Sequence, residues 1–174
     1  MKTIHNSLIA FCLTLCFSSS MAACQTNSAE QRCNKKIELP DKIRSALKRA
    51  PDLTVSCRLN PPVIRGNFGG NEHVDYAILV RQKTSHKRGF IIVFDSGQNV
   101  IVGAGRPVQY GAAAFSDLNF DHWELHKKTR TVESAEQQGP LKLHGDALLA
   151  SYHETASGLF YWDGKRMRWY QQGD

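Results

Sequence analysis

Apolar residues recur at helical spacing in one stretch of the chain, residues 41–50. Four of them fall on one face of a helix, and these are Ile43, Ala46, Leu47 and Ala50. Asp41 suits the N-cap position, and Pro51 ends the pattern. We therefore expect an amphipathic helix that packs one face against the rest of the protein.

The other apolar runs are short, rich in β-branched and aromatic residues, and separated by polar turns, which is typical of β-strands. They cover residues 75–81, 89–94, 99–102, 147–153, 158–162 and 166–170, with 123–126 as a weaker candidate. Asp163-Gly164 is typical of a tight hairpin turn between the last two runs. The pattern predicts an α+β fold, with a mainly antiparallel sheet of five to seven strands and one N-terminal amphipathic helix.

The first residues have the three-part layout of an export signal. Lys2 supplies a positive start, Leu8–Phe17 is an apolar run, and mostly small residues follow up to Ala23. This run is about half of the roughly 20 residues that a transmembrane helix needs. We expect residues 1–23 to be a signal peptide and the mature protein to be exported.

Met21-Ala22-Ala23-Cys24 resembles the lipobox of bacterial lipoproteins, in which an aliphatic residue and two small residues precede a lipidated cysteine. The resemblance implies a membrane anchor of fatty acid, such as palmitate, on Cys24. In enteric-type lipoproteins an aspartate after that cysteine favours the inner membrane, so Gln25 implies the outer membrane, facing the periplasm. The alternative is ordinary cleavage after Ala22 or Ala23, which leaves a soluble periplasmic or secreted protein.

Three cysteines remain after signal removal, namely Cys24, Cys33 and Cys57. An odd thiol is a liability in an oxidising compartment, so lipid on Cys24 would leave Cys33 and Cys57 as one disulfide. That disulfide closes a loop of about 25 residues and adds roughly 3 kcal/mol. Without lipid, Cys24 could pair with either cysteine instead. The expected organisation is a signal peptide (1–23), a lipidated cysteine with a tether (24–36) and a single α+β domain (37–174).

The net charge of the chain excludes few classes of binding partner. The chain has 22 Lys and Arg against 16 Asp and Glu, for a net charge of +6. These cations are spread along the sequence, and no nucleic-acid-binding motif accompanies them. We expect no nucleic-acid partner, and only weak attraction to anionic lipid or envelope polymers.

Residues 66–80 begin with GNFGGNEHVD and resemble the loop of FG-GAP-type repeats, which leads into an apolar strand. In that family alternating acidic side chains hold Ca²⁺, which prefers oxygen ligands. Asn67, Gly69 and Asn71 stand at three metal-facing positions here, and Asp75 alone keeps its carboxylate. The resemblance implies the shape of the loop, with Asn67, Asn71 and Asp75 as the remaining ligand candidates.

A second metal candidate is HWELH, where His122, Glu124 and His126 alternate and would share one face of a strand. Such a set could hold Zn²⁺ with an open coordination position. The glutamate comes one residue too late for the helical H-E-x-x-H pattern of metalloproteases.

A hydrolase is the next class considered, because imidazole, acid and hydroxyl groups follow one another at His153, Glu154, Thr155 and Ser157. Neighbouring residues of a strand point to opposite faces, so His153 and Glu154 cannot easily cooperate. No G-x-S-x-G elbow surrounds any serine. We assign no catalytic residue.

The C-terminal part of the chain is unusually aromatic. Phe160 and Trp162 would share one face of a strand and Tyr161 the other. Cross-strand aromatic pairs stabilise a hairpin by about 0.2–1 kcal/mol each, so much of this composition serves packing. The outward-facing part predicts a binding patch made of Tyr161, Trp162, Lys165, Arg166, Arg168 and Trp169.

These observations predict a non-enzymatic envelope lipoprotein that binds an envelope protein or wall component and needs no cofactor. One alternative is a metal-dependent enzyme or calcium-stabilised module. Another is an inhibitor or immunity protein that neutralises an envelope-targeted enzyme.

Overall fold

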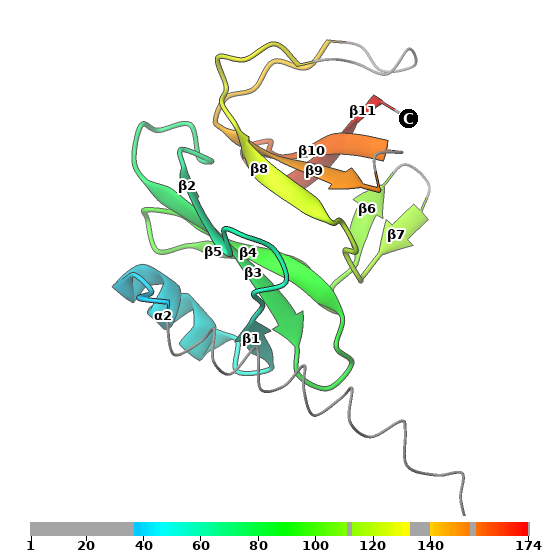
Figure 1. Ribbon diagram of the computed structural model, residues 1–174. Helices are drawn as coiled ribbons and strands as arrows, with labels where there is room; N and C mark the ends of the chain where they lie inside the picture. Colours follow the sequence, from blue (N-terminus) through cyan, green and yellow to red (C-terminus); the bar gives the residue numbers. More distant parts are fainter. Residues whose placement is uncertain (1–36, 111–112, 133–139, 154–155, 174) are drawn as a thin grey trace, which may run out of the picture.

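The computed structural model describes residues 37–110, 113–132, 140–153 and 156–173 (Figure 1). Residues 1–36, which include the expected signal peptide, Cys24 and Cys33, lie outside this described part. The described part contains one helix, α2 (Asp41–Arg49), and eleven strands. The strands are β1 (Leu53–Val55), β2 (Val63–Gly66), β3 (Asp75–Gln82), β4 (Arg88–Val93), β5 (Asn99–Gly103), β6 (Val108–Tyr110), β7 (Ala113–Phe115), β8 (His122–His126), β9 (Ala147–Tyr152), β10 (Ala156–Trp162) and β11 (Met167–Gly173). No helix among the described residues is long and apolar enough to cross a membrane.

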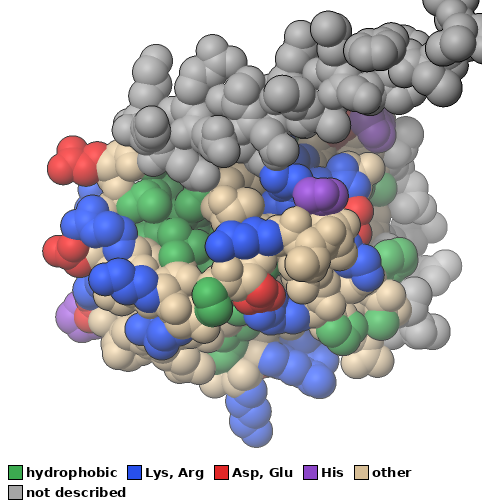
Figure 2. Space-filling view, turned by 90° about the horizontal axis from the view of Figure 1, so that it is seen from below, with side chains coloured by type: hydrophobic (Ala, Val, Ile, Leu, Met, Phe, Trp, Pro, Cys, Tyr) green, Lys and Arg blue, Asp and Glu red, His purple; other side chains and the backbone are tan. Residues whose placement is uncertain are grey.

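Helix α2 forms where the apolar pattern predicts it, and Ile43 and Ala46 are fully buried. Pro40 occupies the N-cap position, so the prediction that Asp41 is the N-cap is wrong by one residue. Asp41 instead lies in the first turn, where a negative charge is favourable at the positive end of the helix dipole. Lys and Arg side chains are exposed around α2 on the underside of the molecule (Figure 2).

The first sheet contains β1 to β5 in antiparallel pairing. Its order is β1-β3-β4-β5, and β2 also pairs with β3. Successive residues of β3 alternate between two cores, because side chains of a strand point to opposite faces. Ile78 and Val80 pack in the core beneath α2, while Ala77 and Leu79 pack in the core between the sheets. Both faces of this sheet are therefore covered.

The second sheet has the order β11-β10-β9-β8, and β6 and β7 form a separate hairpin beside it (Figure 1). Phe90 of the first sheet contacts the rings that line the core between the sheets. Its ring centroid lies 5.1 Å from that of Phe160, edge to face, and 6.5 Å from those of Phe120 and Trp123. The largest core cluster is thus rich in aromatic rings and joins both sheets.

A buried carboxylate, Asp146, holds the loop after β2 against the second sheet. It accepts hydrogen bonds from the Asn67 N–H at 2.9 Å, the Lys128 N–H at 3.1 Å and the Lys127 Nζ at 3.0 Å. Burial raises the pKa of Asp146, but these hydrogen bonds outweigh burial and leave the pKa below its usual value. The carboxylate is therefore ionised and serves as a structural acceptor.

The expected fold is confirmed as mainly antiparallel β-structure with one short helix. The expected number of strands was too low, and the strands form three sheets where one was predicted. The missed strands, β1, β2, β6 and β7, contain only three or four residues each. The predicted hairpin at Asp163-Gly164 is present, with Gly164 at a φ of +92° and the Asp163 Oδ1 accepting the N–H groups of Lys165 and Arg166 at 2.8 Å.

Candidate functional site

An apolar hollow of about 340 Å³ lies between the β6–β7 hairpin, the segment after β7 and the second sheet. We call it the aromatic pocket. Its apolar walls are Val108, Phe115, Leu118, Tyr152, Phe160 and Trp169. Asp117, Asn119 and Gln171 are the polar residues at its edge. An apolar hollow of this size with a few polar groups is the usual form of a small-ligand or anchor-residue site.

Trp169 is the pocket wall for which the sequence contains the clearest local indication. Its ring centroid lies 4.6 Å from that of Phe160 and 6.4 Å from that of Tyr152, and its Nε1 donates to the Gln171 Oε1 at 3.1 Å. The indole lies across Gly158 of the neighbouring strand, where a Cβ would come within 2.3 Å of the Trp169 Cζ2. A glycine in a strand interior marks such a close approach. Gly158 therefore makes room for the wall of the pocket.

Phe115 stands at the mouth of the pocket and is 49% exposed. Only one other large apolar side chain of the described residues, Val74, is comparably exposed. An exposed aromatic ring beside an apolar hollow is typical of a contact surface, whereas isolated exposed apolar residues are common and carry no such meaning.

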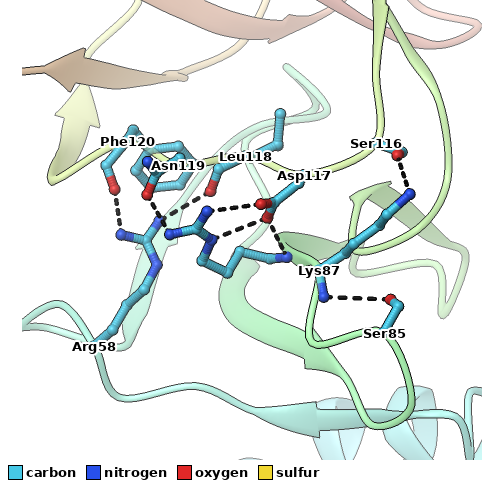
Figure 3. A network of polar contacts seen from close by, with 9 residues as sticks. Arg58, Ser85, Lys87, Ser116, Asp117, Leu118, Asn119 and Phe120 are labelled. Atoms are coloured by element: carbon cyan, nitrogen blue, oxygen red, sulfur yellow. Dashed lines mark hydrogen bonds and ion pairs between the residues drawn. The ribbon is translucent and has the colours of Figure 1, made fainter.

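The polar side of the pocket is fixed by two arginines (Figure 3). The Arg88 guanidinium binds Asp117 in a bidentate manner, at 2.9 and 2.6 Å, and also donates to the Asn119 Oδ1. Arg58 donates to the carbonyl oxygens of Leu118, at 3.2 Å, and Phe120. Segment 117–120 is therefore held in place by side chains from the first sheet and from the loop after β1.

Among the described residues that line the pocket the one acid, Asp117, is paired with Arg88. The hydrogen bond from Arg88 lowers the pKa of Asp117, so its carboxylate is charged and neutralised by the same guanidinium. Burial lowers the pKa of Arg58, whose guanidinium lies 4.7 Å above the Phe120 ring. Arg88, Asp117 and Arg58 therefore hold segment 117–120 in position as one wall of the pocket.

A second, more polar hollow of about 640 Å³ adjoins the aromatic pocket and shares Val108 and Trp169 with it. We call it the edge groove. Residues 100–102 of β5 form one wall, residues 107–109 a second, and residues 166–169 at the start of β11 a third. The groove thus lies between edge strands of the two sheets.

The predicted aromatic and basic patch is brought together only in part. Arg166, Arg168 and Trp169 line the edge groove. Trp162 is partly buried and packs against the core between the sheets instead, with its ring centroid 4.9 Å from that of Phe94. Tyr161 packs against a small cluster on the other face of the sheet, and Lys165 is exposed in the turn.

Within the described residues no group of three His, Cys, Asp or Glu side chains is arranged to hold a metal ion. His122 and Glu124 approach to 3.8 Å at the surface, whereas His126 is 4% exposed. The burial of His126 lowers its pKa, and its Nε2 has no hydrogen-bond partner among the described residues. The structure therefore does not assemble His122, Glu124 and His126 as a set of metal ligands.

In the FG-GAP-like loop the side chains of Asp75 and Asn71 accept backbone N–H groups, whereas the buried Asn67 Oδ1 has no hydrogen-bond partner among the described residues. The carboxylate of Asp75 is fully buried and accepts the Gly69 N–H at 2.8 Å and the Asp95 N–H at 2.7 Å. The Asn71 Oδ1 accepts the His73 N–H at 3.1 Å, and Asn67 donates its N–H to Asp146. These backbone contacts hold the shape of the loop.

Glu154 and Thr155, which the hydrolase hypothesis considered, lie outside the described residues. His153 is exposed, and its Nδ1 lies 2.8 Å from the Asp121 Oδ2 in an open depression that Ser151 and His122 also line. In the described part of the chain no hydrogen bond connects His153 to Ser151. A histidine–carboxylate pair without a bonded nucleophile does not form a catalytic triad.

Sequence reasoning identified Trp169 but missed Phe115, Tyr152 and the 117–120 segment. Gly158 opposite Trp169 was the one local indication of the pocket, because glycine is unfavourable inside a strand without a packing reason. No family model matches the chain, and no characterised protein or solved structure is significantly similar to it.

Proposed function

We propose that this protein is an exported, non-enzymatic binding protein that captures an apolar group of its ligand in the aromatic pocket. The observation that carries the proposal is the hollow walled by Trp169, Phe160 and Phe115. Arg88 neutralises Asp117 at its polar edge, and Arg58 is engaged by the carbonyl oxygens of Leu118 and Phe120, which favours an apolar occupant over a catalytic reaction at that point.

We also propose that the protein is a lipoprotein anchored through Cys24, with Cys33 and Cys57 as a disulfide. The lipobox-like sequence and the odd cysteine count support this proposal. An intact mass of the protein purified from bacterial envelopes tests it, because cleavage before Cys24, acylation and the loss of two hydrogens each change the mass. Cys24 found in a disulfide would contradict it.

The pocket is tested with 1-N-phenylnaphthylamine, an apolar probe whose fluorescence rises in apolar surroundings. We expect saturable binding to the wild type and at least tenfold weaker binding to Phe115→Ala. Val74→Ala is the matched control, since Val74 is also an exposed large apolar side chain but does not line the pocket. Equal loss in both variants, or no saturable binding to the wild type, would contradict the proposal.

A further inference from the structure

The edge groove has a backbone wall as well as side-chain walls. Strand β5 pairs with β4, and its last residue, Gly103, also forms an isolated antiparallel bridge with Arg106. In the described part of the chain no strand pairs with the outer edge of residues 99–102. An unpaired strand edge presents backbone N–H and C=O groups that a further strand can bind. Residues 100–102 of β5 line the groove, so this edge faces the hollow.

The hydrogen-bond pattern identifies which residue of β5 offers its backbone to the groove. Two hydrogen bonds flank the pairing of β4 with β5. At one end of the pairing the Phe94 N–H donates to the Gln98 C=O, and at the other end the Ala104 N–H donates to the Arg88 C=O. Residues of an antiparallel strand alternate between bonding to their neighbour and pointing away from it, so Ile101 points away from β4. Ile101 therefore presents one donor and one acceptor at the centre of the groove wall.

The opposite wall is basic. The side chains of Arg166 and Arg168 line the groove and are 60% and 43% exposed. Asp163 pairs with Arg168 at 2.6 Å and approaches Arg166 only to 4.0 Å. No Asp or Glu is among the described residues that line the groove. Arg166 therefore retains most of its capacity to bind a further carboxylate.

We infer that the partner of this protein is an extended, acidic peptide segment that adds as a strand to β5. Its backbone pairs with Ile101, its carboxylates face Arg166 and Arg168, and one apolar side chain enters the aromatic pocket past Trp169. Strand addition with pockets for selected side chains is a recurring mode of peptide recognition. The inference rests on the proposed binding role of the pocket and specifies the class of ligand.

The same edge could in principle receive β5 of a second copy of this chain. Charge argues against that occupant, because two copies joined there would bring their arginines together in a protein that already has a net charge of +6. An acidic segment neutralises the same arginines. Charge complementarity thus favours the heterologous partner.

The test begins with selection from a phage-displayed library of random dodecapeptides on the purified mature protein. We expect the selected peptides to combine Asp or Glu with an aromatic or branched apolar residue. A synthetic copy is then titrated by fluorescence anisotropy against two variants of one residue. Ile101→Ala removes the side chain and keeps the N–H, whereas Ile101→Pro also removes the outward donor, which an edge strand tolerates. We expect Ile101→Pro to bind at least tenfold more weakly than Ile101→Ala.

Arg166→Ser supplies a second readout, since it should weaken binding and reduce the salt dependence of the Kd. Lys48→Ser on α2 is its matched control, because it removes an exposed charge outside the groove. Melting curves, together with phenylnaphthylamine binding, check that Ile101→Pro is folded with an intact pocket.

Three results would overturn the inference. These are the absence of selected acidic peptides, equal binding by the two Ile101 variants, and concentration-dependent dimers that Ile101→Pro dissociates. If phenylnaphthylamine fails to bind while the peptides bind through Ile101, the apolar pocket is wrong and the strand-addition site stands.

Discussion

Removal of the Asp146 carboxylate tests whether a single buried acceptor holds the FG-GAP-like loop to the second sheet. The Asp146 side chain is 5% exposed, and Asp146→Ala leaves the N–H groups of Asn67 and Lys128 without their acceptor. An unsatisfied buried donor costs about 1–3 kcal/mol, so the two together cost about 2–6 kcal/mol. The Lys127 side chain is 57% exposed and can turn to water, so its share is small.

Asp146→Asn keeps one oxygen, but its amide group would face a backbone donor, so we expect a loss of about 1–3 kcal/mol. Urea unfolding at pH 7 measures both variants. Asp41→Ala is the control, because the Asp41 side chain is 90% exposed, and the loss of its contact with Arg44 and of its charge in the first turn of α2 should cost no more than about 1 kcal/mol. A loss in Asp146→Ala no larger than in Asp41→Ala would refute the reasoning.

The same contacts give a pH dependence with a definite sign. The pKa of Asp146 is lowered from 3.8 on folding, so its stabilising effect is fully present above that value and is lost as pH falls through the folded pKa. The difference in unfolding free energy between the wild type and Asp146→Ala should therefore shrink in acid. A difference that is constant from pH 7 to pH 2 would contradict the assignment.

Three further outcomes are expected. Burial lowers the pKa of His126 below 6.5, so the wild type should lose stability as pH falls below about 6.5. The unfolding free energy of His126→Leu should depend less on pH between pH 7 and 5. Gly158→Ala should displace the Trp169 indole, lower the free energy of unfolding by about 1–3 kcal/mol and weaken phenylnaphthylamine binding. Unaltered binding would show that the indole does not form the wall of the pocket. EDTA should leave the melting temperature unchanged, and a drop would revive the metal hypotheses for His122, Glu124 and His126 and for the 66–75 loop.

The longer elements were predictable because their patterns are local. Helix α2 has its apolar face within one sequence window, and the β10–β11 hairpin is specified by Asp163-Gly164. The short strands β6 and β7 contain three residues each, too few for an alternating pattern to be recognised, and β6 contacts β11, which lies far away in the sequence. Their absence from the prediction is why the aromatic pocket was missed, since Val108 of β6 and Phe115 of β7 line it.

Only one part of the aromatic pocket, Trp169, was predictable from the sequence. The aromatic tail pointed to Trp169, but alternation could not separate Trp162, which packs on Phe94, from Trp169, which packs over Gly158. The Arg88–Asp117 pair joins residues far apart in sequence, and nothing near either residue indicates its partner. Long-range pairing of this kind is decided by the fold.

The most direct test of the central claim is a heteronuclear NMR titration of the three tryptophan indole N–H groups with phenylnaphthylamine. Trp169 lines the pocket, whereas Trp123 is buried with its Nε1 bonded to the Pro61 carbonyl at 2.8 Å, and Trp162 packs against Phe94. The account predicts a saturable shift of the Trp169 signal alone. A shift of all three signals together, or of Trp162 in place of Trp169, would contradict it.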